Sequence, residues 1–199
     1  MRGIRLRDVA APDGLYLIDD YFADALDYEH PVHISGTAVT KAWFDRAGGF
    51  PAGVHAGEDI VFVARLACLG TLAYSRRATA DYSAPALAGG RAARLVRRPQ
   101  SPDRVAAALG ALRASAPRHA AQLARYLASW HRMRAVSYLE LDERRAAAAE
   151  LWRAMRLSGP ARKDLECAGL LALPAVPRRI ALLQARRWRR RTQPRTEPS

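Results

Sequence analysis

The sequence from Gly48 to Leu69 reads Gly-Gly-Phe-Pro-Ala-Gly-Val-His-Ala-Gly-Glu-Asp-Ile-Val-Phe-Val-Ala-Arg-Leu-Ala-Cys-Leu, and it holds the only Glu-Asp pair in the chain. Four glycines within ten residues allow the backbone to turn tightly and to approach a ligand closely. The pair then opens an apolar segment, Asp59 to Leu69, whose spacing predicts a helix. Two carboxylates at a helix start are candidates for chemistry. They are also favourable partners for the positive end of a helix dipole, and local physics alone favours this capping role.

The residues around this stretch predict short helices and strands. In the helix from Asp59 to Leu69 we expect one buried face, and Gly70 ends it; the apolar positions are Ile60, Val63, Ala64, Ala67 and Cys68. A helix from Thr40 to Ala47 precedes the loop, capped by Thr40 and ended by Gly48. Its inward positions are Trp43, Phe44 and Ala47. The sequence Pro31 to Val39 predicts a strand that buries Val32 and Ile34, and on the same reasoning Ala38 and Val39.

The N-terminal segment offers a second acidic pair. Asp19 and Asp20 follow an apolar strand, Leu15 to Ile18. They can be interpreted as a metal site for a nucleotide diphosphate, or Asp19 can cap a helix from Asp20 to Leu26 that buries Tyr21, Phe22 and Leu26. The cap is favoured because a metal site needs further carboxylates within reach. Beyond Gly70, short strands are expected at Thr71–Tyr74 and Ala78–Tyr82, and Pro85 and Gly89-Gly90 close this part of the chain.

From Arg91 onward the pattern is helical. Expected helices run from Asp103 to Ala114, from Pro117 to Leu141, from an Asp142 cap to Leu157, and from Arg162 to Leu173. The second of these carries an apolar stripe, which we interpret as packing: Leu123, Tyr126, Leu127, Trp130, Met133 and Val136 to Tyr138. Together with the third it resembles, weakly, one hairpin of a tetratricopeptide-like module.

The net charge of +13 belongs to the second half of the chain. Residues 1–85 carry 8 basic and 11 acidic side chains, whereas residues 86–199 carry 24 and 8. Such an excess attracts phosphate-rich partners. A basic amphipathic segment, Arg178 to Arg191, includes Trp188 and suits an anionic membrane surface. A merely solvated tail and nucleic-acid contact remain the second and third interpretations.

Cysteine usage and hydropathy bear on the compartment. Cys68 and Cys167 lie in separate apolar segments without metal-ligand spacing, so two buried, reduced thiols are expected. The first thirty residues are rich in charge and show no secretory signal, and no apolar stretch approaches the ~20 residues of a membrane span. These features favour a cytoplasmic protein.

A set of short motifs follows in order along the first part of the chain. In chain order they are Ser35-Gly36-Thr37-Ala38-Val39, Lys41-Ala42-Trp43-Phe44, Ala47-Gly48-Gly49-Phe50, Gly57-Glu58-Asp59 with Arg65-Leu66-Ala67, and Ala73-Tyr74 with Tyr82. Together they resemble the acceptor half of family 2 glycosyltransferases of GT-A fold. Five such pieces in register over about fifty residues are fairly specific. They favour a catalytic over a capping interpretation of the Glu-Asp pair.

The resemblance implies a role for each matching position. Asp59 is expected to act as the general base that takes a proton from an acceptor hydroxyl during inverting attack on a nucleotide sugar. Glu58 is expected to hold the acceptor or to steady the loop. The acceptor side would be lined by Ser35, Gly36, Thr37, Trp43 and His55. The fold class implied is α/β, a partial GT-A-like domain with a mixed sheet, followed by an all-α region.

The chain also departs from the family pattern. Only 34 residues precede Ser35, which is too few for the nucleotide-binding half, and the Asp-x-Asp metal motif is absent. We therefore expect no cofactor in this chain, Mg²⁺ or Mn²⁺ only in the complete enzyme, and a fragment, truncated product or split enzyme that is inactive alone. The expected domains are residues 1–88 (partial GT-A domain), 91–175 (helical region) and 176–199 (basic tail).

Two classes of function follow. The first is glycosyl transfer from a nucleotide sugar to a glycan or lipid-linked acceptor in envelope or extracellular glycan synthesis, at the cytoplasmic face of the cell membrane. The second is a non-catalytic helical adaptor that binds a protein partner or a membrane surface. Nucleic acid is the least favoured partner, since only the arginine excess points to it.

Overall fold

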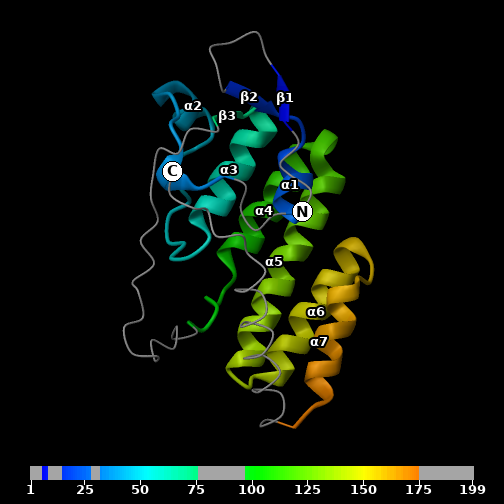
Figure 1. Ribbon diagram of the computed structural model, residues 1–199. Coiled ribbons are helices and arrows are strands. Elements are labelled where there is room, and N and C mark those ends of the chain that lie inside the picture. Colours follow the sequence, from blue (N-terminus) through cyan, green and yellow to red (C-terminus); the bar gives the residue numbers. More distant parts are fainter. Residues whose placement is uncertain (1–5, 9–14, 28–31, 76–96, 175–199) are drawn as a thin grey trace, which may run out of the picture. The chain divides into compact units, whose positions relative to one another are not determined.

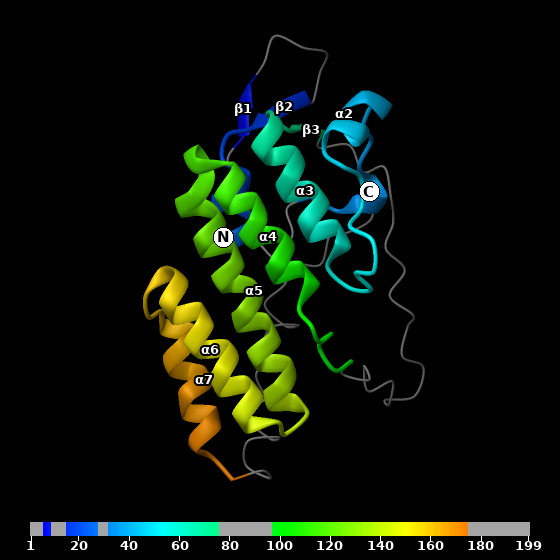
Figure 2. The ribbon, with the colours of Figure 1, turned by 180° about the vertical axis from the view of Figure 1, so that it is seen from behind.

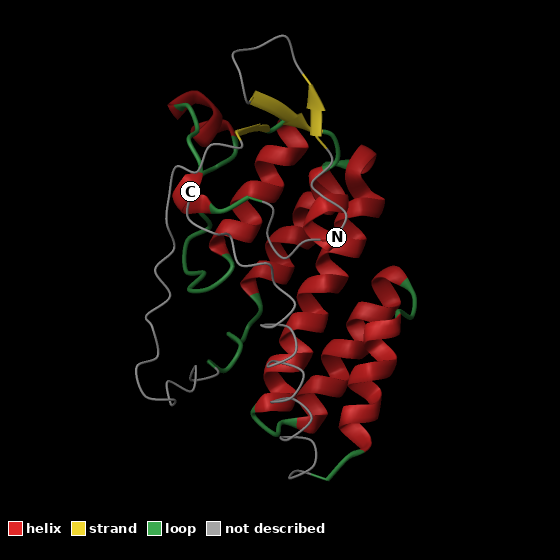
Figure 3. Cartoon of the chain, viewed as in Figure 1, coloured by secondary structure: helices red, strands yellow, loops and turns green. Residues whose placement is uncertain are grey.

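The computed structural model describes residues 6–8, 15–27, 32–75 and 97–174. The expected strand at Ala78–Tyr82, the closing glycines at 89–90 and the basic tail at 176–199 lie outside them. The described residues form a mixed fold, mostly helical, with one small sheet (Figures 1 and 3). They fall into two compact units, each of which is described by itself: the first holds the described residues up to 75 and 100–129, and the second holds 97–99 and 130–174.

The sheet of the first unit has three antiparallel strands in the order β1–β2–β3, namely β1 (Leu6–Asp8), β2 (Leu15–Ile18) and β3 (Ala73–Ser75). Leu6 pairs with Ile18, and Tyr16 pairs with Tyr74. The expectation of a mixed sheet is wrong for these strands. Six residues separate β1 from β2, and a parallel connection needs a dozen or more, so this pair is antiparallel.

Helix α1 (Tyr21–Asp27) follows β2 and buries Tyr21 and Phe22, as expected. Its N-cap is Asp20, not Asp19: the Asp20 carboxylate accepts a hydrogen bond from the Ala23 backbone N–H at 3.0 Å. Asp19 instead lies 3.5 Å from the Arg7 guanidinium of β1. The capping interpretation is therefore confirmed, but one residue further along the chain, and Leu26 is only half-buried.

The strand expected at 31–39 is wrong. The segment forms a single 3₁₀ turn, η1 (Ile34–Gly36), in which the Gly36 N–H donates to the His33 carbonyl. The Thr37 hydroxyl donates to the same carbonyl at 2.8 Å. Short polar side chains that satisfy their own backbone compete with strand pairing, and here the local bonds prevail. Ile34 still packs inward, whereas Val39 is exposed.

Helix α2 (Lys41–Arg46) is capped as expected, because the Thr40 hydroxyl accepts a hydrogen bond from the Trp43 N–H. Ala47 is buried and Phe44 is half-buried. The expectation that Trp43 points inward is wrong, because its side chain is 38% exposed. The ring packs over Gly70, where a Cβ atom on residue 70 would lie 3.1 Å from it.

Helix α3 (Glu58–Leu69) forms the centre of the first unit and ends at Gly70 as expected. The expected single buried face is too narrow, because buried residues surround most of the helix: Val61, Phe62, Val63, Ala64, Leu66 and Cys68. Phe62 contacts Phe44 and Phe50, with ring centroids 5.3 and 4.6 Å away. Helix α4 (Arg104–Ser115) covers another side of α3 (Figure 2), which explains why one helix face does not suffice.

The helices that follow α3 agree closely with their expected ranges. Asp103 caps α4 by accepting the Ala106 N–H at 2.9 Å. Pro117 opens a 3₁₀ turn, η2 (Pro117–His119), which leads into α5 (Ala120–Glu140). The first half of α5 buries Leu123, Tyr126 and Leu127 in the first unit. Tyr126 packs edge-on against Phe22 at 5.6 Å and so joins α5 to α1.

The second unit consists of the end of α5 with α6 (Arg144–Ser158) and α7 (Arg162–Ala172). Its apolar core comprises Ala135, Tyr138, Leu139, Ala147, Leu151 and Cys167. Asp142 does not cap α6. It adopts the left-handed conformation (φ 64°) in the turn, and Glu143 occupies the cap position without a side-chain bond. Met133, expected in the packed stripe, is 45% exposed.

Two further expectations concern thiols and membrane spans. Cys68 and Cys167 are both buried and both free of disulfide bonds, as expected. None of the helices in the described part of the chain combines the length and the apolar character needed to cross a membrane.

Candidate functional site

The glycine loop delivers the Glu58-Asp59 pair to the first turn of α3. Gly57 is the N-cap of the helix and has φ 88°, a backbone conformation that an L side chain adopts only at a cost. Its position fixes both carboxylates beside the free N–H groups of the helix start. This end of the helix dipole is positive and favours negative charge.

The two carboxylates have few partners. Asp59 Oδ1 accepts a hydrogen bond from the Ile60 N–H at 2.8 Å. Glu58 Oε2 is buried, and it has no hydrogen-bond partner among the described residues. Within the same residues, neither side chain forms an ion pair with Arg, Lys or His. A buried polar atom left without a partner costs ~1–3 kcal/mol, so its position calls for a reason beyond folding.

Two buried tyrosines lie near Asp59. The hydroxyl groups of Tyr21 on α1 and Tyr126 on α5 are 3.1 Å apart. The pKa of Tyr21 is raised to about 12: burial is the main cause, the hydrogen bond with Tyr126 opposes it, and the Asp59 charge adds to it. Burial also raises the pKa of Tyr126, with smaller contributions from Tyr21 and Asp59. Both phenols therefore stay protonated at neutral pH and face the negative field of Asp59. Sequence reasoning interpreted both as packing residues and did not connect them to the pair.

Gln100 holds the glycine loop in place. Its side-chain amide donates to the Gly53 carbonyl at 2.9 Å, and its carbonyl oxygen accepts the His55 N–H at 3.4 Å. Gly53 has φ 69°, and an added Cβ there would lie 2.0 Å from Arg104 Nη1. The positive φ favours glycine at this position, whereas the Arg104 guanidinium is the end of a flexible side chain and could move aside. No sequence signal marked Gln100, since it lies 45 residues from His55.

Arg65 braces the start of the loop from the middle of α3. Its Nη1 donates to the carbonyls of Ala47 at 3.4 Å and Gly49 at 3.2 Å. This contact gives a physical reason for the Gly-Gly-Phe sequence and an arginine almost two turns into the next helix to occur together. The arginine satisfies carbonyl groups that the turn leaves without backbone partners.

The structure does not gather all predicted acceptor residues around the pair. Ser35 and Gly36 are exposed in η1, Thr37 is half-buried, and the neighbouring Ile34 packs on Phe62 and Leu66 in the middle of α3. Trp43 lies at the far end of α3, over Gly70. Twelve helical residues span about 18 Å, so Trp43 is remote from Glu58. His55 is exposed and stands in the loop just before the pair.

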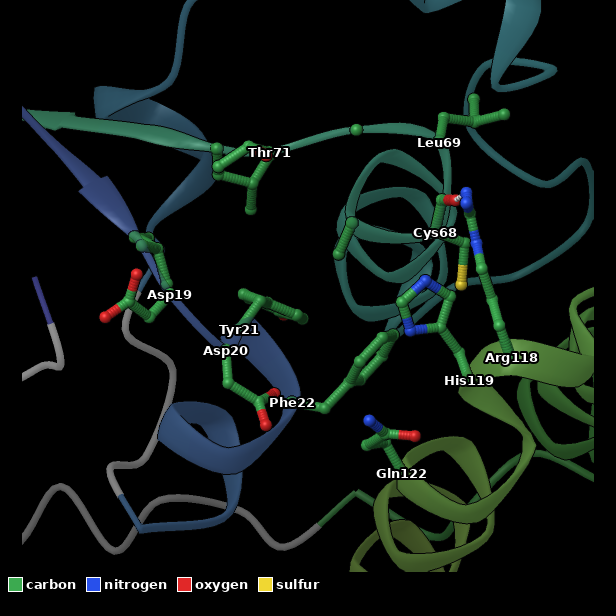
Figure 4. Close-up of a pocket in the computed structure, with 14 residues that line it drawn as sticks. Asp19, Asp20, Tyr21, Phe22, Cys68, Leu69, Thr71, Arg118, His119 and Gln122 are labelled. Atoms are coloured by element: carbon green, nitrogen blue, oxygen red, sulfur yellow. Dashed lines mark hydrogen bonds between the residues drawn. The ribbon is translucent and has the colours of Figure 1, made fainter. Parts of the chain in front are cut away.

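The second acidic pair, Asp19 and Asp20, borders a pocket of about 430 Å³ (Figure 4). Its other polar side chains include Arg118, His119 and Gln122. The two carboxylates point in different directions in Figure 4, and both are engaged, by Arg7 and by the α1 cap. They are therefore a poor fit for a divalent ion, which needs several oxygens converging on one point.

The thiol of Cys68 borders the same pocket and stays protonated. Burial raises its pKa to about 11, although the nearby Arg118 charge lowers it. Arg118 Nη2 donates to the Cys68 backbone carbonyl at 2.9 Å (Figure 4). A thiol in this state is a weak nucleophile and a weak metal ligand, so the pocket offers no thiolate chemistry at neutral pH.

Comparisons with protein-family models, with curated proteins and with solved structures give no match to this chain.

Proposed function

We propose that this chain carries the acceptor side of an inverting glycosyltransferase similar to family 2, and that it does not transfer sugar by itself. One observation supports this most directly. The Glu-Asp pair of the resembling motif stands in the first turn of α3, and Glu58 keeps a buried carboxylate oxygen that has no partner among the described residues. An oxygen of this kind keeps an unused acceptor, although it is not exposed to solvent.

In the proposed reaction Asp59 takes the proton of an acceptor hydroxyl. The oxygen attacks the anomeric carbon of the donor sugar as the bond to the nucleoside diphosphate breaks on the opposite face, which inverts the configuration. Glu58 holds the acceptor or steadies the loop. His55 is the acceptor candidate that precedes the pair in the loop, and Trp43 is too remote for direct contact with the reacting hydroxyl.

The donor site is expected outside these residues. The sequence lacks an Asp-x-Asp motif, and Asp19 and Asp20 serve an ion pair and a cap. The GT-A-like arrangement proposed for the first unit thus covers the acceptor half alone. Calorimetry with UDP-glucose and GDP-mannose tests this point: we expect no heat of binding to the purified chain. Micromolar binding of either nucleotide sugar would contradict the proposal.

The catalytic assignment is tested by Asp59→Asn in the enzyme complete with its nucleotide-binding half. Loss of a general base lowers transfer by about 10²- to 10⁴-fold. Asp45→Asn is the matched control, because Asp45 is an exposed aspartate bound to Lys41 at 2.5 Å and is remote from the chemistry proposed. Undiminished transfer by Asp59→Asn would remove the assignment.

The proposed acceptor is a glycan or a lipid-linked saccharide used in envelope or extracellular glycan synthesis. The proposed place of action is the inner face of the cell membrane, reached through Arg178–Arg191. That segment lies outside the described residues. Binding to vesicles of phosphatidylglycerol that is lost on deleting residues 178–199 would support this placement, and equal binding by the shortened chain would oppose it.

A helical adaptor is the alternative, and one observation favours it. The second unit exposes two large apolar side chains, Trp152 on α6 (60%) and Leu165 on α7 (74%). Such residues can anchor a protein partner. The reading frame of the DNA directly upstream of Met1 distinguishes the two functions: sequence encoding a strand followed by Asp-x-Asp supports the transferase, and unrelated sequence supports the adaptor.

A further inference from the structure

A second pocket in the first unit, of about 520 Å³, is lined by three arginines and lies beside the C-terminal half of α3. Arg46 comes from the end of α2, Arg65 from α3, and Arg118 from η2. Apolar side chains complete the walls, among them Leu69 and Leu112, and Ser115 contributes a hydroxyl. We call this cavity the arginine pocket. It is distinct from the Glu58-Asp59 turn at the other end of the helix.

Each of the three guanidinium groups is held by something other than a carboxylate. Arg65 donates through Nη1 to two backbone carbonyls, and Arg118 donates through Nη2 to the carbonyl of Cys68. Arg46 lies over the Trp43 ring, 5.2 Å from its centroid. A guanidinium has five N–H donors, so anchoring through one nitrogen leaves the others for a ligand. The side chains are ordered in advance, and their charge is not neutralised.

The lining of this pocket holds no described carboxylate, although Arg118 also borders the pocket that Asp19 and Asp20 line. None of its three arginines forms an ion pair within the described residues. The nearest acid along the chain, Asp45, is bound to Lys41. Three like charges facing one cavity repel each other, and the apolar walls reduce the screening by water. Purely structural arginines would be expected to meet carboxylates, as Arg132 and Arg134 do in the second unit.

We infer that the arginine pocket binds a phosphate or diphosphate group through Arg46, Arg65 and Arg118. Planar guanidinium forks match phosphate oxygens in pairs of hydrogen bonds, and a diphosphate has enough oxygens to engage all three. The group can come from a soluble phosphorylated ligand other than a nucleotide sugar, which needs the separate nucleotide-binding half, or from a phospholipid head group. The inference goes beyond the proposed function, because it assigns a binding site away from the Glu58-Asp59 turn and stands whether or not that pair is catalytic.

The inference is tested by calorimetric titration of the full chain with inorganic pyrophosphate. The double variant Arg46→Gln/Arg118→Gln is compared with the wild-type chain. Removing two charge-assisted contacts weakens binding at least about tenfold. Arg113→Gln is the matched control, because Arg113 is an exposed arginine of α4 that does not line the pocket. This substitution lowers the net charge of the chain and leaves the pocket unchanged.

A vesicle assay separates the two sources of the phosphate group. Vesicles of phosphatidylcholine with phosphatidic acid present a phosphate on a surface, and vesicles of phosphatidylcholine alone do not. Weaker pyrophosphate binding by the double variant supports a soluble ligand. A lipid head group is supported by a different result. Pyrophosphate binding is then too weak to measure, while binding to the phosphatidic acid vesicles is weakened in the double variant and unchanged in Arg113→Gln. The basic tail is the same in all variants, so its contribution to either probe cancels.

Equal binding of both probes by the wild-type chain and the double variant would overturn the inference, and so would an equal loss in Arg113→Gln. If circular dichroism shows that the double variant is unfolded, Arg46→Gln alone decides between the same outcomes. That variant keeps both arginines that are anchored to backbone carbonyls, and Arg46 itself is exposed.

Discussion

The carboxylates of the two units differ in what surrounds them. In the second unit, Glu150 is 2% exposed and lies 2.6 Å from His131, 3.2 Å from Arg134 and 3.0 Å from Arg153. In the first unit, Glu58 Oε2 is also buried but has no hydrogen-bond partner among the described residues. Buried carboxylates are normally neutralised by partners, as Glu150 is. Glu58 Oε2 at the start of α3 departs from this rule.

Asp164 follows the rule of the second unit. Arg132 binds it with two nitrogens, at 2.7 and 2.9 Å, and the Ala161 N–H donates to it at 2.7 Å. The hydrogen bond from Arg132 lowers the pKa of Asp164, against an opposing effect of burial. For Glu150, burial raises the pKa, but the hydrogen bond and charge of His131 and the Arg134 guanidinium outweigh it, and the net shift is downward. These two carboxylates are committed to holding helices together.

The largest effect expected from this contrast is that of Glu150→Gln. The change keeps the size of the side chain but leaves Arg134, 6% exposed, without its buried counter-charge. Breaking a buried ion pair from one side costs about 3–5 kcal/mol. Urea unfolding of the second unit should show this loss, and a loss below about 1 kcal/mol would mean that the network stabilises no more than exposed ion pairs do.

Acid should destabilise the second unit by a smaller amount. The pKa values of Glu150 and Asp164 are lowered in the folded state, so these carboxylates bind fewer protons there than in the unfolded chain. Their contribution to the stability of the second unit is therefore complete above about pH 4. It is lost as the pH falls through their folded pKa values. Thermal melting between pH 2 and 7 measures the slope. Asp164→Asn should flatten it, because this variant lacks one of the two carboxylates. An unchanged slope would contradict the assignment.

The smallest effect on stability is expected for Glu58→Gln. This carboxylate has no cationic partner among the described residues, so removing its charge breaks no ion pair. We expect a change within about 1 kcal/mol in urea unfolding, because glutamine keeps the shape of the side chain and only the interaction with the helix dipole is lost. A loss comparable to that of Glu150→Gln would show that Glu58 serves the fold, and the contrast between the units would fail.

Much of the helical structure followed from local signals in the sequence. Thr40, Gly70 and Asp103 end or begin helices where expected, because a side-chain cap or a glycine acts on its immediate neighbours. Local signals also failed in a specific way. Asp19 and Asp20 are equally good caps by residue type, and which of them caps α1 depends on Arg7 in a separate strand.

Contacts between distant residues could not be predicted. His131 and Glu150 are 19 residues apart, and Arg132 and Asp164 are 32 apart, so only the packing of three helices brings them together. The turn at Ile34–Gly36 replaced an expected strand because Thr37 bonds its own backbone. Of the candidate site, the sequence indicated the Glu-Asp pair but not Tyr21, Tyr126 or Gln100, which approach it from other elements.

The most direct test of the contrast measures two quantities, the initial rate of sugar transfer and the melting temperature, on Asp59→Asn and Glu150→Gln in the complete enzyme. We predict that Asp59→Asn lowers the rate by about 10²- to 10⁴-fold and leaves the melting temperature nearly unchanged. Glu150→Gln should lower the melting temperature and retain the rate at temperatures where it is folded. An Asp59→Asn enzyme that transfers sugar at the wild-type rate would contradict the account.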